Sequence, residues 1–366
     1  MYIWERPDWP AFRWDRDKLA TPLEAAHLKQ GRFLGRMERL GAELRSQAEI
    51  EAVTEEALKN AEIEGEILRR ETVHSSVARR LGMPTAALGP EDRRADGLVQ
   101  MTLDATKNFG APLTRERLFG WHAALFPSEY SELRRIRVGA WRDDTEGPMQ
   151  VRSGPVGKEY VHFQAPPADR VDREMAAFLE WFNSPPALDG IVYATLAHLW
   201  FVTIHPFDDG NGRMARALAD MSLARAENSG VRFYSLSSQI RRERPEYYAS
   251  LEQTQKGDLD VTGRLVWFTD CFSRALDTAE QTVADVLRAA EFWQHYAMTS
   301  FNERQRAVLN RFLGDFEGKL TAPKWKALAK CSLPTAQRDL KDLVDRGILV
   351  RNPGGSKNTS YSVAGW

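Results

Sequence analysis

The feature that most constrains this 366-residue chain is the segment His205-Pro-Phe-Asp-Asp-Gly-Asn-Gly-Arg-Met-Ala-Arg216, together with the apolar run before it. Residues 191–204 are almost entirely apolar, which predicts a buried helix that stops at His205 because proline cannot continue it. The run is shorter than the ~20 residues that a membrane span needs, and it contains His198. A glycine-rich turn then leads into a second helix from Asn211. We therefore expect two core helices joined by a short loop.

The residue types in this loop favour phosphate chemistry. Gly210 and Gly212 flank Asn211, so backbone N–H groups crowd together at a helix N-terminus, which is an anion-binding arrangement. Arg213 and Arg216 lie three positions apart, on one helical face from which both can bind phosphates. A carboxylate beside such a site can hold Mg²⁺ together with phosphate oxygens. A histidine, an acid, an anion nest and two arginines together predict phosphoryl or nucleotidyl transfer.

Residues 205–216 match every fixed position of the motif HPF-x-[D/E]-G-N-G-R-x-x-R, and in this the chain resembles the Fic family. The resemblance implies a mainly α-helical fold, a Fic-type helical bundle with a β-hairpin flap and the motif on a loop between two helices. Most Fic enzymes are protein adenylyltransferases, which move AMP from ATP to a protein hydroxyl with Mg²⁺. Family members that act as kinases carry lysine at the position of Gly212, so the glycine here favours nucleotidyl transfer.

The resemblance also implies a role for each motif residue. His205 would be the base that deprotonates a Ser, Thr or Tyr hydroxyl of the target protein or of the chain itself. Asp209 would bind Mg²⁺. The phosphates of ATP would be held by Gly210, Asn211, Gly212, Arg213 and Arg216. The two arginines would also stabilise the charge of the leaving pyrophosphate.

Two further segments resemble family features. Short β-rich pieces predict a hairpin, and Lys158–Phe163 stands where the family has the flap that binds an extended target segment by strand addition. Downstream, Arg244-Pro-Glu-Tyr-Tyr248 resembles the segment that contacts adenosine. Tyr247 and Tyr248 are therefore ATP-binding candidates, with ordinary core or half-exposed helix tyrosines as the alternative.

A helical run from Glu49 to Arg80 contains Asn60-Ala-Glu-Ile-Glu64-Gly65. This resembles the family's inhibitory motif [S/T]-x-x-x-E-[G/N], except that Asn60 replaces Ser or Thr. Gly65 is less favourable than alanine in a helix by about 1 kcal/mol, so either something approaches closely there or the helix ends. We expect Glu64 to pair with Arg216 and keep the γ-phosphate from its productive position. A solvated glutamate in a charged helix is the alternative.

Changes in amino-acid composition and in the predicted secondary structure along the chain indicate three regions. Residues 1–90 hold an aromatic, proline-rich arm that we expect to act as a structural clasp, then the inhibitory-helix region and a linker at Gly82–Pro90. Residues 91–298 hold the Fic catalytic domain and its trailing helices. Residues 299–366 read as three helices followed by two strands about a Pro353–Gly355 turn, with Ser332 and Gly347 bounding the third helix. That order predicts a winged helix-turn-helix.

Charge separates this last region from the rest. Residues 301–366 carry 12 Lys and Arg against 6 Asp and Glu, which leaves the first 300 residues at −7 within a total of −1. A nucleic-acid partner is therefore open for the C-terminal region, although winged helices also dock proteins. Base contacts would come from the helix near Leu333, through Thr335, Gln337 and Arg338. The support for this partner is the set of basic residues in the expected winged helix: Lys324, Lys326, Lys330, Arg338, Lys341 and, at the end of the wing, Lys357.

Composition limits the remaining possibilities. Cys271 and Cys331 are too few and too far apart for a disulfide framework or a zinc site. The N-terminus has no basic and apolar signal-peptide pattern, so we expect a soluble, cytoplasmic protein without a membrane partner. Many Fic proteins self-associate, so a homo-oligomer stays open. The alternatives to adenylylation are a DNA-binding regulator with the Fic body as sensor, transfer of UMP or GMP, and AMP removal with Glu64 as the base for a water.

Overall fold

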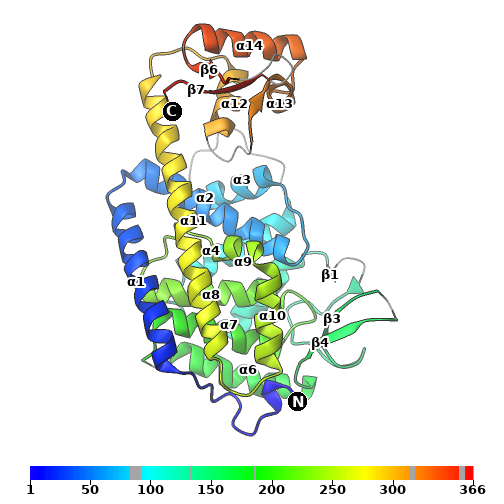
Figure 1. Ribbon diagram of the computed structural model, residues 1–366. Coiled ribbons are helices and arrows are strands. Elements are labelled where there is room, and N and C mark those ends of the chain that lie inside the picture. The colour runs from blue at the N-terminus through cyan, green and yellow to red at the C-terminus, as the bar shows by residue number, and fades with distance from the viewer. Residues whose placement is uncertain are drawn as a thin grey trace. The chain divides into compact units, whose positions relative to one another are not determined.

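The structure is a computed structural model that describes residues 1–82, 92–131, 134–155, 157–184, 187–313, 318–353 and 359–365. It is mainly helical with small hairpins (Figure 1). The chain divides into two units, Met1–Glu280 and Gln281–Trp366, with α11 (Thr262–His295) running through the boundary. The inhibitory-helix region and the catalytic region thus belong to one unit. The predicted linker lies outside the described residues beyond Gly82.

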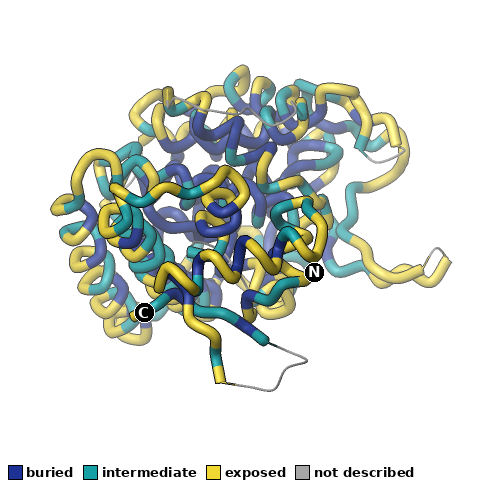
Figure 2. Tube along the Cα trace, turned by 90° about the horizontal axis from the view of Figure 1, so that it is seen from above, coloured by how far each residue is buried: buried dark blue, intermediate teal, exposed yellow. Residues whose placement is uncertain are grey.

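The first unit is built around the two helices that the sequence predicted, α7 (Gly190–Ile204) and α8 (Asn211–Glu227). The Asp189 carboxylate caps α7 by accepting hydrogen bonds from the backbone N–H groups of Ile191 and Val192. Both helices are buried over almost their whole length, and buried segments gather inside the bundle in Figure 2. In the described part of the chain, no helix is both long enough and apolar enough to cross a bilayer.

Other helices of the first unit enclose this pair. They are α1 (Arg16–Glu38), α2 (Ala42–Ile63), α3 (Arg70–Arg80), α4 (Arg93–Lys107), α5 (Arg115–Leu125), α6 (Ala168–Asn183), α9 (Leu236–Arg242) and α10 (Arg244–Gln255), with a short 3₁₀ helix, η1 (Ile3–Glu5). The sequence analysis did not identify α9. That helix spans only seven residues, too few to display a helical period.

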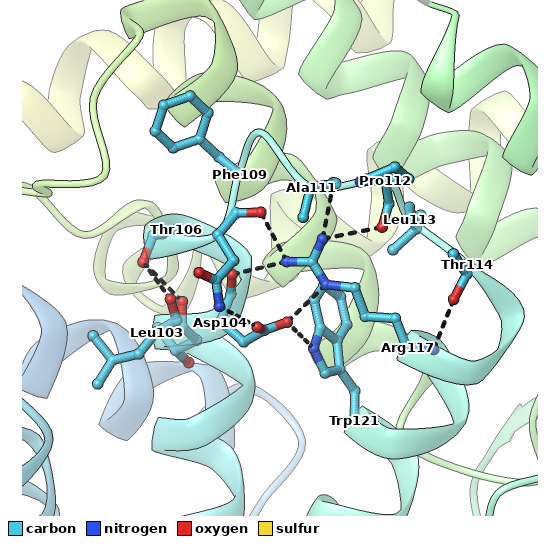
Figure 3. Close-up of polar contacts among 12 residues, drawn as sticks. Leu103, Asp104, Thr106, Phe109, Ala111, Pro112, Leu113, Thr114, Arg117 and Trp121 are labelled. Atoms are coloured by element: carbon cyan, nitrogen blue, oxygen red, sulfur yellow. Dashed lines mark hydrogen bonds and ion pairs between the residues drawn. The ribbon is translucent and has the colours of Figure 1, made fainter.

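Helix α5 is held against α4 by a polar cluster centred on Asp104 (Figure 3). The Asp104 carboxylate accepts hydrogen bonds from Nε of Arg117 and Nε1 of Trp121, both at 2.7 Å. Thr114 caps α5 by accepting from the backbone N–H of Arg117. These bonds fix the position of His122, the residue after Trp121, beside the loop that joins α7 to α8.

The helical run predicted from Glu49 to Arg80 is wrong as a single element, because α2 ends at Ile63 and α3 begins at Arg70. Gly65 has a φ of +88°, a left-handed conformation that glycine adopts without steric penalty. The N–H groups of Gly65 and Glu66 donate to the carbonyls of Glu62 and Ala61, both at 3.1 Å. This pattern is a Schellman motif. Of the two outcomes that the sequence allowed at Gly65, the helix end is the one that occurs.

The predicted hairpin consists of β3 (Gln150–Ser153) and β4 (Tyr160–Gln164), paired antiparallel. The aromatic arm packs on its base, because Nε1 of Trp4 donates to the carbonyl of Gln164 at 2.7 Å and the Tyr2 ring contacts the Phe163 ring edge-on. The arm thus packs against the hairpin, and its role as a clasp stays a prediction. A second small hairpin, β1 (Tyr130–Ser131) with β2 (Arg134–Arg135), was not foreseen.

The second unit contains α12 (Glu303–Leu313), β5 (Leu320–Thr321), α13 (Ala322–Leu328), α14 (Leu333–Asp345), β6 (Leu349–Arg351) and β7 (Ser360–Val363). The strands form one sheet in the order β5-β7-β6. The predicted helices and hairpin are present, and β5 is an addition that the sequence analysis did not foresee. The tip of the expected wing, with Gly355 and Lys357, lies outside the described residues.

Candidate active site

The loop between α7 and α8 is closed by its own side chains. His205 ends α7 with a φ of +52°, and its backbone N–H donates to the carbonyl of Phe201. Asn211 then accepts a hydrogen bond from the N–H of Phe207 at 3.0 Å and donates to its carbonyl at 2.8 Å. Asn211, one of the predicted phosphate contacts, thus uses its buried side chain to hold the loop. Only its backbone N–H belongs to the helix N-terminus.

Phe207 anchors the loop in the core, and His122 on α5 stacks against it with ring centroids 4.3 Å apart. The backbone N–H of Gly139 donates to Nδ1 of His122, so Nε2 carries the ring proton and donates to the carbonyl of Asp209 at 3.2 Å. Burial lowers the pKa of His122 to about 4, which keeps the imidazole neutral in this role. His122 is a positioning residue that the sequence analysis missed.

The two glycines at the start of α8, Gly210 and Gly212, are closely packed against other residues. Gly210 has a φ of +80°, and a Cβ there would press on the Phe126 ring. A Cβ at Gly212 would overlap the carboxylate of Glu64. The two glycines therefore let the loop turn and let a carboxylate approach the N-terminus of α8, where helix N–H groups favour an anion.

Arg216 points from α8 toward the end of α2. Its Nη2 donates to Oε1 of Glu64 at 2.7 Å, and its Nε donates to Oδ1 of Asn60 at 2.8 Å. The predicted contact between Glu64 and Arg216 is therefore present in the structure. Burial by itself would lower the pKa of Arg216, but the Glu64 carboxylate outweighs it and raises that pKa. Asn60, the departure from the inhibitory motif, supplies an acceptor for the same guanidinium.

Arg213 has a partner that the sequence analysis missed. Its Nη1 donates to Oε2 of Glu66 at 2.9 Å, and its guanidinium lies 4.8 Å from the centre of the Phe126 ring. The Schellman turn at Gly65 thus directs two carboxylates, Glu64 and Glu66, at the two motif arginines. The sequence feature that could have indicated both contacts is a glycine between two glutamates, Glu64-Gly65-Glu66.

Each of the two arginines also has a buried N–H donor without a hydrogen-bond partner among the described residues. Nε of Arg213 and Nη1 of Arg216 are buried and have no hydrogen-bond partner among the described residues. Buried donors of this kind are normally satisfied. Two unsatisfied guanidinium donors at a helix N-terminus fit the phosphate oxygens of a nucleotide.

Tyr247 and Tyr248 are consecutive residues of α10 whose rings meet edge-on with centroids 5.1 Å apart, but they differ in burial. Tyr247 is 1% exposed, and its hydroxyl lies 2.9 Å from Nε2 of His198 inside the core, so its ring has no face open to a base. Tyr248 is 37% exposed and its hydroxyl donates to the carbonyl of Ile63 at 3.3 Å. Burial, together with the Glu64 charge, raises the pKa of Tyr248 to about 12. Tyr247 therefore borders the site from the core, where it interacts with Arg216, and Tyr248 borders it from the surface beside Glu64.

His205 presents a neutral imidazole. Its Nδ1 lies 3.1 Å from the carbonyl of Val202, which places the ring proton on Nδ1 and leaves Nε2 as an acceptor. Burial lowers the pKa of His205 to about 4, and Arg142 adds to this. The Arg142 side chain is buried, and its Nε donates to the carbonyl of His205 at 2.7 Å. This second positioning residue was also missed.

Asp209 is in the same loop as His205 and is the predicted Mg²⁺ ligand. Its carboxylate accepts from the N–H of Gly210 and from the hydroxyl of Ser131, and it lies 3.6 Å from Nη2 of Arg213. The side chain is 40% exposed. The described residues contain no group of three or more acidic, histidine or cysteine side chains able to enclose a metal. One half-exposed carboxylate is nevertheless what Mg²⁺ uses when substrate phosphates and waters supply its other ligands.

Fold and site together define a class: a helical protein with a glycine-rich loop at a helix N-terminus, whose two arginines are bound by acids from its own N-terminal region. Residues 112–223 match the family model described as "Fic/DOC family", and residues 2–83 match "Domain of unknown function (DUF4172)". The chain therefore contains a region that is similar to the Fic/DOC family, preceded by a region that is similar to DUF4172.

Sequence relatives match part of the chain. The protein adenylyltransferase Fic of Nematostella vectensis is 37% identical over 123 residues, which cover 32% of this chain and 26% of the relative. The protein adenylyltransferase fic-1 of Caenorhabditis briggsae is 42% identical over 107 residues, which cover 29% of this chain and 18% of the relative. The matches thus span about a quarter or less of these relatives.

The fold extends further than the sequence similarity. A crystal structure of a Fic family protein from Desulfovibrio desulfuricans superposes with a TM-score of 0.54 at 20% identity, covering 95% of this chain and 96% of that one. The two proteins share a fold along almost their whole length.

Proposed function

We propose that this chain is a protein adenylyltransferase that transfers AMP from ATP to a Ser, Thr or Tyr hydroxyl of a target protein or of itself, and that its own N-terminal region inhibits it. The observation that carries the proposal is the pairing of Arg216 with Glu64 beside the neutral imidazole of His205. The loop between α7 and α8 thus has a neutral histidine at one end and two arginines at the other. One of these arginines is bound by Glu64, whose carboxylate takes the place of a phosphate.

The reaction follows from the positions of these groups. Nε2 of His205 accepts the proton of the target hydroxyl, and the oxygen attacks the α-phosphorus of ATP. The bond from this phosphorus to the bridging oxygen breaks, and pyrophosphate leaves with its charge stabilised by Arg213 and Arg216. Asp209 would hold Mg²⁺, which supplies further neutralisation of phosphate charge when bound.

Target binding is proposed at the flap. Strand β4 pairs with β3, so an extended peptide could add to this two-stranded hairpin through backbone hydrogen bonds. The flap near Lys158–Phe163 is held in place from α10, because Glu252 contacts His162 at 2.6 Å and the Tyr160 hydroxyl at 3.1 Å. A positioned flap lowers the entropy lost when a target segment binds.

Inhibition follows from the competition for Arg216. While the guanidinium binds Glu64 and Asn60, it is turned toward α2 and is not available to the γ-phosphate of ATP. Tyr248 supports this state by donating to the carbonyl of Ile63, next to Glu64. ATP in its productive position would have to displace the Glu64 carboxylate, which links nucleotide binding to release of the N-terminal region.

The experiment that tests the proposal uses two labelled forms of ATP. The Glu64→Gly chain is incubated with Mg²⁺ and ATP labelled at either the α- or the γ-phosphate, and the label on protein is measured. Adenylylation retains the α-label and releases the γ-label with pyrophosphate. Retention of the γ-label would show phosphoryl transfer instead, and retention only from α-labelled UTP or GTP would show transfer of another nucleotide.

Glu66→Gln should give a small activation. This change removes the carboxylate from Arg213 but keeps the size of the side chain, and Glu66 is partly exposed, so its ion pair contributes about 0.2–1 kcal/mol. We expect AMP transfer to rise less than about fivefold in initial-rate assays with labelled ATP, and to rise further when Glu64→Gly is added. An unchanged rate in both backgrounds would show that Glu66 does not restrain Arg213.

The pH dependence should reflect the lowered pKa of His205. The base must be neutral, so activity is present above the folded-state pKa of about 4 and is lost as pH falls through it. We expect kcat/KM of the Glu64→Gly chain to stay level from about pH 8 to 5, whereas an unperturbed histidine would lose activity near about 6.5. Circular dichroism at each pH separates this loss from unfolding, and an acid limb near neutrality would contradict the assignment.

A further inference from the structure

We propose that the second unit is a module that binds duplex DNA, and that its contact surface is the N-terminal half of α14 with the turn before it and β6. This inference does not depend on the transferase reaction. Three observations carry it: the geometry of the turn, the pairing of the acids on α14, and the exposure of the remaining cations.

The turn between α13 and α14 has the form of a helix-turn-helix. It spans residues 329–332, and within it Lys330 takes a φ of +47° while the N–H of Cys331 donates to the carbonyl of Lys326 at 3.2 Å. Ser332 then caps α14 by accepting from the N–H of Thr335. Helix-turn-helix motifs use a turn of three or four residues. Their second helix enters the major groove with its N-terminal residues toward the base edges.

Helix α14 has one apolar and one polar side. Ala336, Leu340 and Leu343 are fully buried in the core of the second unit with Trp325. The opposite side is exposed and carries hydrogen-bond donors, Gln337 and Arg338 in the N-terminal half and Lys341 in the C-terminal half. Arginine and glutamine are the side chains that bind guanine and adenine edges through paired hydrogen bonds.

The acidic side chains of α14 are paired within the unit. Asp339 is buried and accepts hydrogen bonds from Nε and Nη2 of Arg304 at 3.0 and 3.1 Å. The exposed acids each bind a cation of the same helix, Asp342 with Arg346 and Asp345 with Lys341. Their negative charge therefore lies in the C-terminal half or in the core. The N-terminal half is left without an acid that would repel a phosphate.

Exposed cations lie on α13, in the turn, on α14 and on β6. They are Lys326, Lys330, Arg338 and Arg351. Arg338 makes two contacts of 3.4 Å to its own helix, with the carbonyl of Pro334 and the hydroxyl of Thr335, which are at the weak end of hydrogen bonding. Residues 301–366 carry twice as many basic as acidic residues, whereas the rest of the chain is acidic. The positive charge is therefore concentrated in the part of the chain that contains the helix-turn-helix, which complements the density of duplex phosphates.

Fluorescence anisotropy with the full chain tests this inference. The probes are labelled duplexes of about 30 base pairs with mixed sequence, the matching single strand as a comparison, and salt varied from about 50 to 200 mM. Each phosphate contact contributes about 0.9 to the slope of log affinity against log salt, so four cations predict a slope of about −3 to −4. Lys326→Glu with Arg338→Glu should weaken binding at least about tenfold and reduce the slope by about 2.

The matched control is Arg32→Glu, a reversal of an exposed arginine on α1, which should leave the affinity unchanged. Circular dichroism and the melting temperature show whether the double variant is folded. The inference is overturned if the folded double variant binds duplex as tightly as the unchanged chain. It is also overturned if no salt-dependent binding of duplex appears at about 50 mM salt, or if heparin and the single strand bind as tightly as duplex. Such outcomes would leave an acidic protein surface as the partner class for this unit.

Discussion

Glu64→Gly should raise AMP transfer at limiting ATP by about 5- to 150-fold, the range of a coupling free energy of 1–3 kcal/mol. The substitution removes the carboxylate that binds Nη2 of Arg216 at 2.7 Å and lets that guanidinium turn to the γ-phosphate. The same change leaves a buried arginine with only Asn60 as a hydrogen-bond partner among the described residues. We therefore expect a lower melting temperature without nucleotide and a larger increase on adding ATP than in the unchanged chain.

A matched control separates the lost charge from the added glycine. Glu62→Gly places glycine in the last turn of the same helix, at a backbone cost of about 1 kcal/mol, and leaves the pair of Glu64 with Arg216 in place. Initial rates with α-labelled ATP should rise for Glu64→Gly and stay at the starting level for Glu62→Gly. Equal rates in the two folded variants would show that Glu64 does not inhibit.

His205→Asn in the Glu64→Gly background should lower AMP transfer by about 10²- to 10⁴-fold, the usual contribution of general acid–base catalysis. Asparagine is the suitable replacement because residue 205 has a φ of +52°, a left-handed conformation that asparagine tolerates better than alanine. It keeps a polar side chain but has no nitrogen able to accept the hydroxyl proton.

Binding should survive this substitution. His205 is proposed to act on the target hydroxyl, so ATP should raise the melting temperature of the double variant about as much as that of Glu64→Gly. His74→Ala, on α3 outside the site, serves as the control for loss of a histidine. Retention of most of the transfer rate by a folded His205→Asn chain would contradict its role as the base.

Much of the site could be predicted because its parts are neighbours along the chain. The end of α7 at His205, the turn at Gly210 and the start of α8 at Asn211 follow from local rules for proline, glycine and helix ends. Thr114 and Ser332 cap their helices for the same reason. The spacing of Arg213 and Arg216 likewise placed both on one face of α8.

Other parts could not be predicted because they depend on which faces meet. Tyr247 and Tyr248 are adjacent, yet one is in the core beside His198 and the other is at the surface beside Glu64. Helical periodicity predicts that neighbours point in different directions, but it does not determine which direction is buried until the partners of α10 are known. His122 and Arg142 were missed for the same reason, since each acts on the loop from a distant segment.

The sequence by itself determined the mainly helical fold and the glycine-rich loop at the start of a helix, because short-range sterics and hydrogen bonding decide both of them. At Gly65 it left a helix end and a close approach open, and the structure decided between the two. Only the tertiary structure decided that Glu66 binds Arg213, that Asn60 supports Glu64 at Arg216, and that the acids of α14 are paired. The first two contacts join residues about 150 positions apart. Such pairs form only when packing of the apolar faces brings the end of α2 to the start of α8, and local sequence carries no record of that approach.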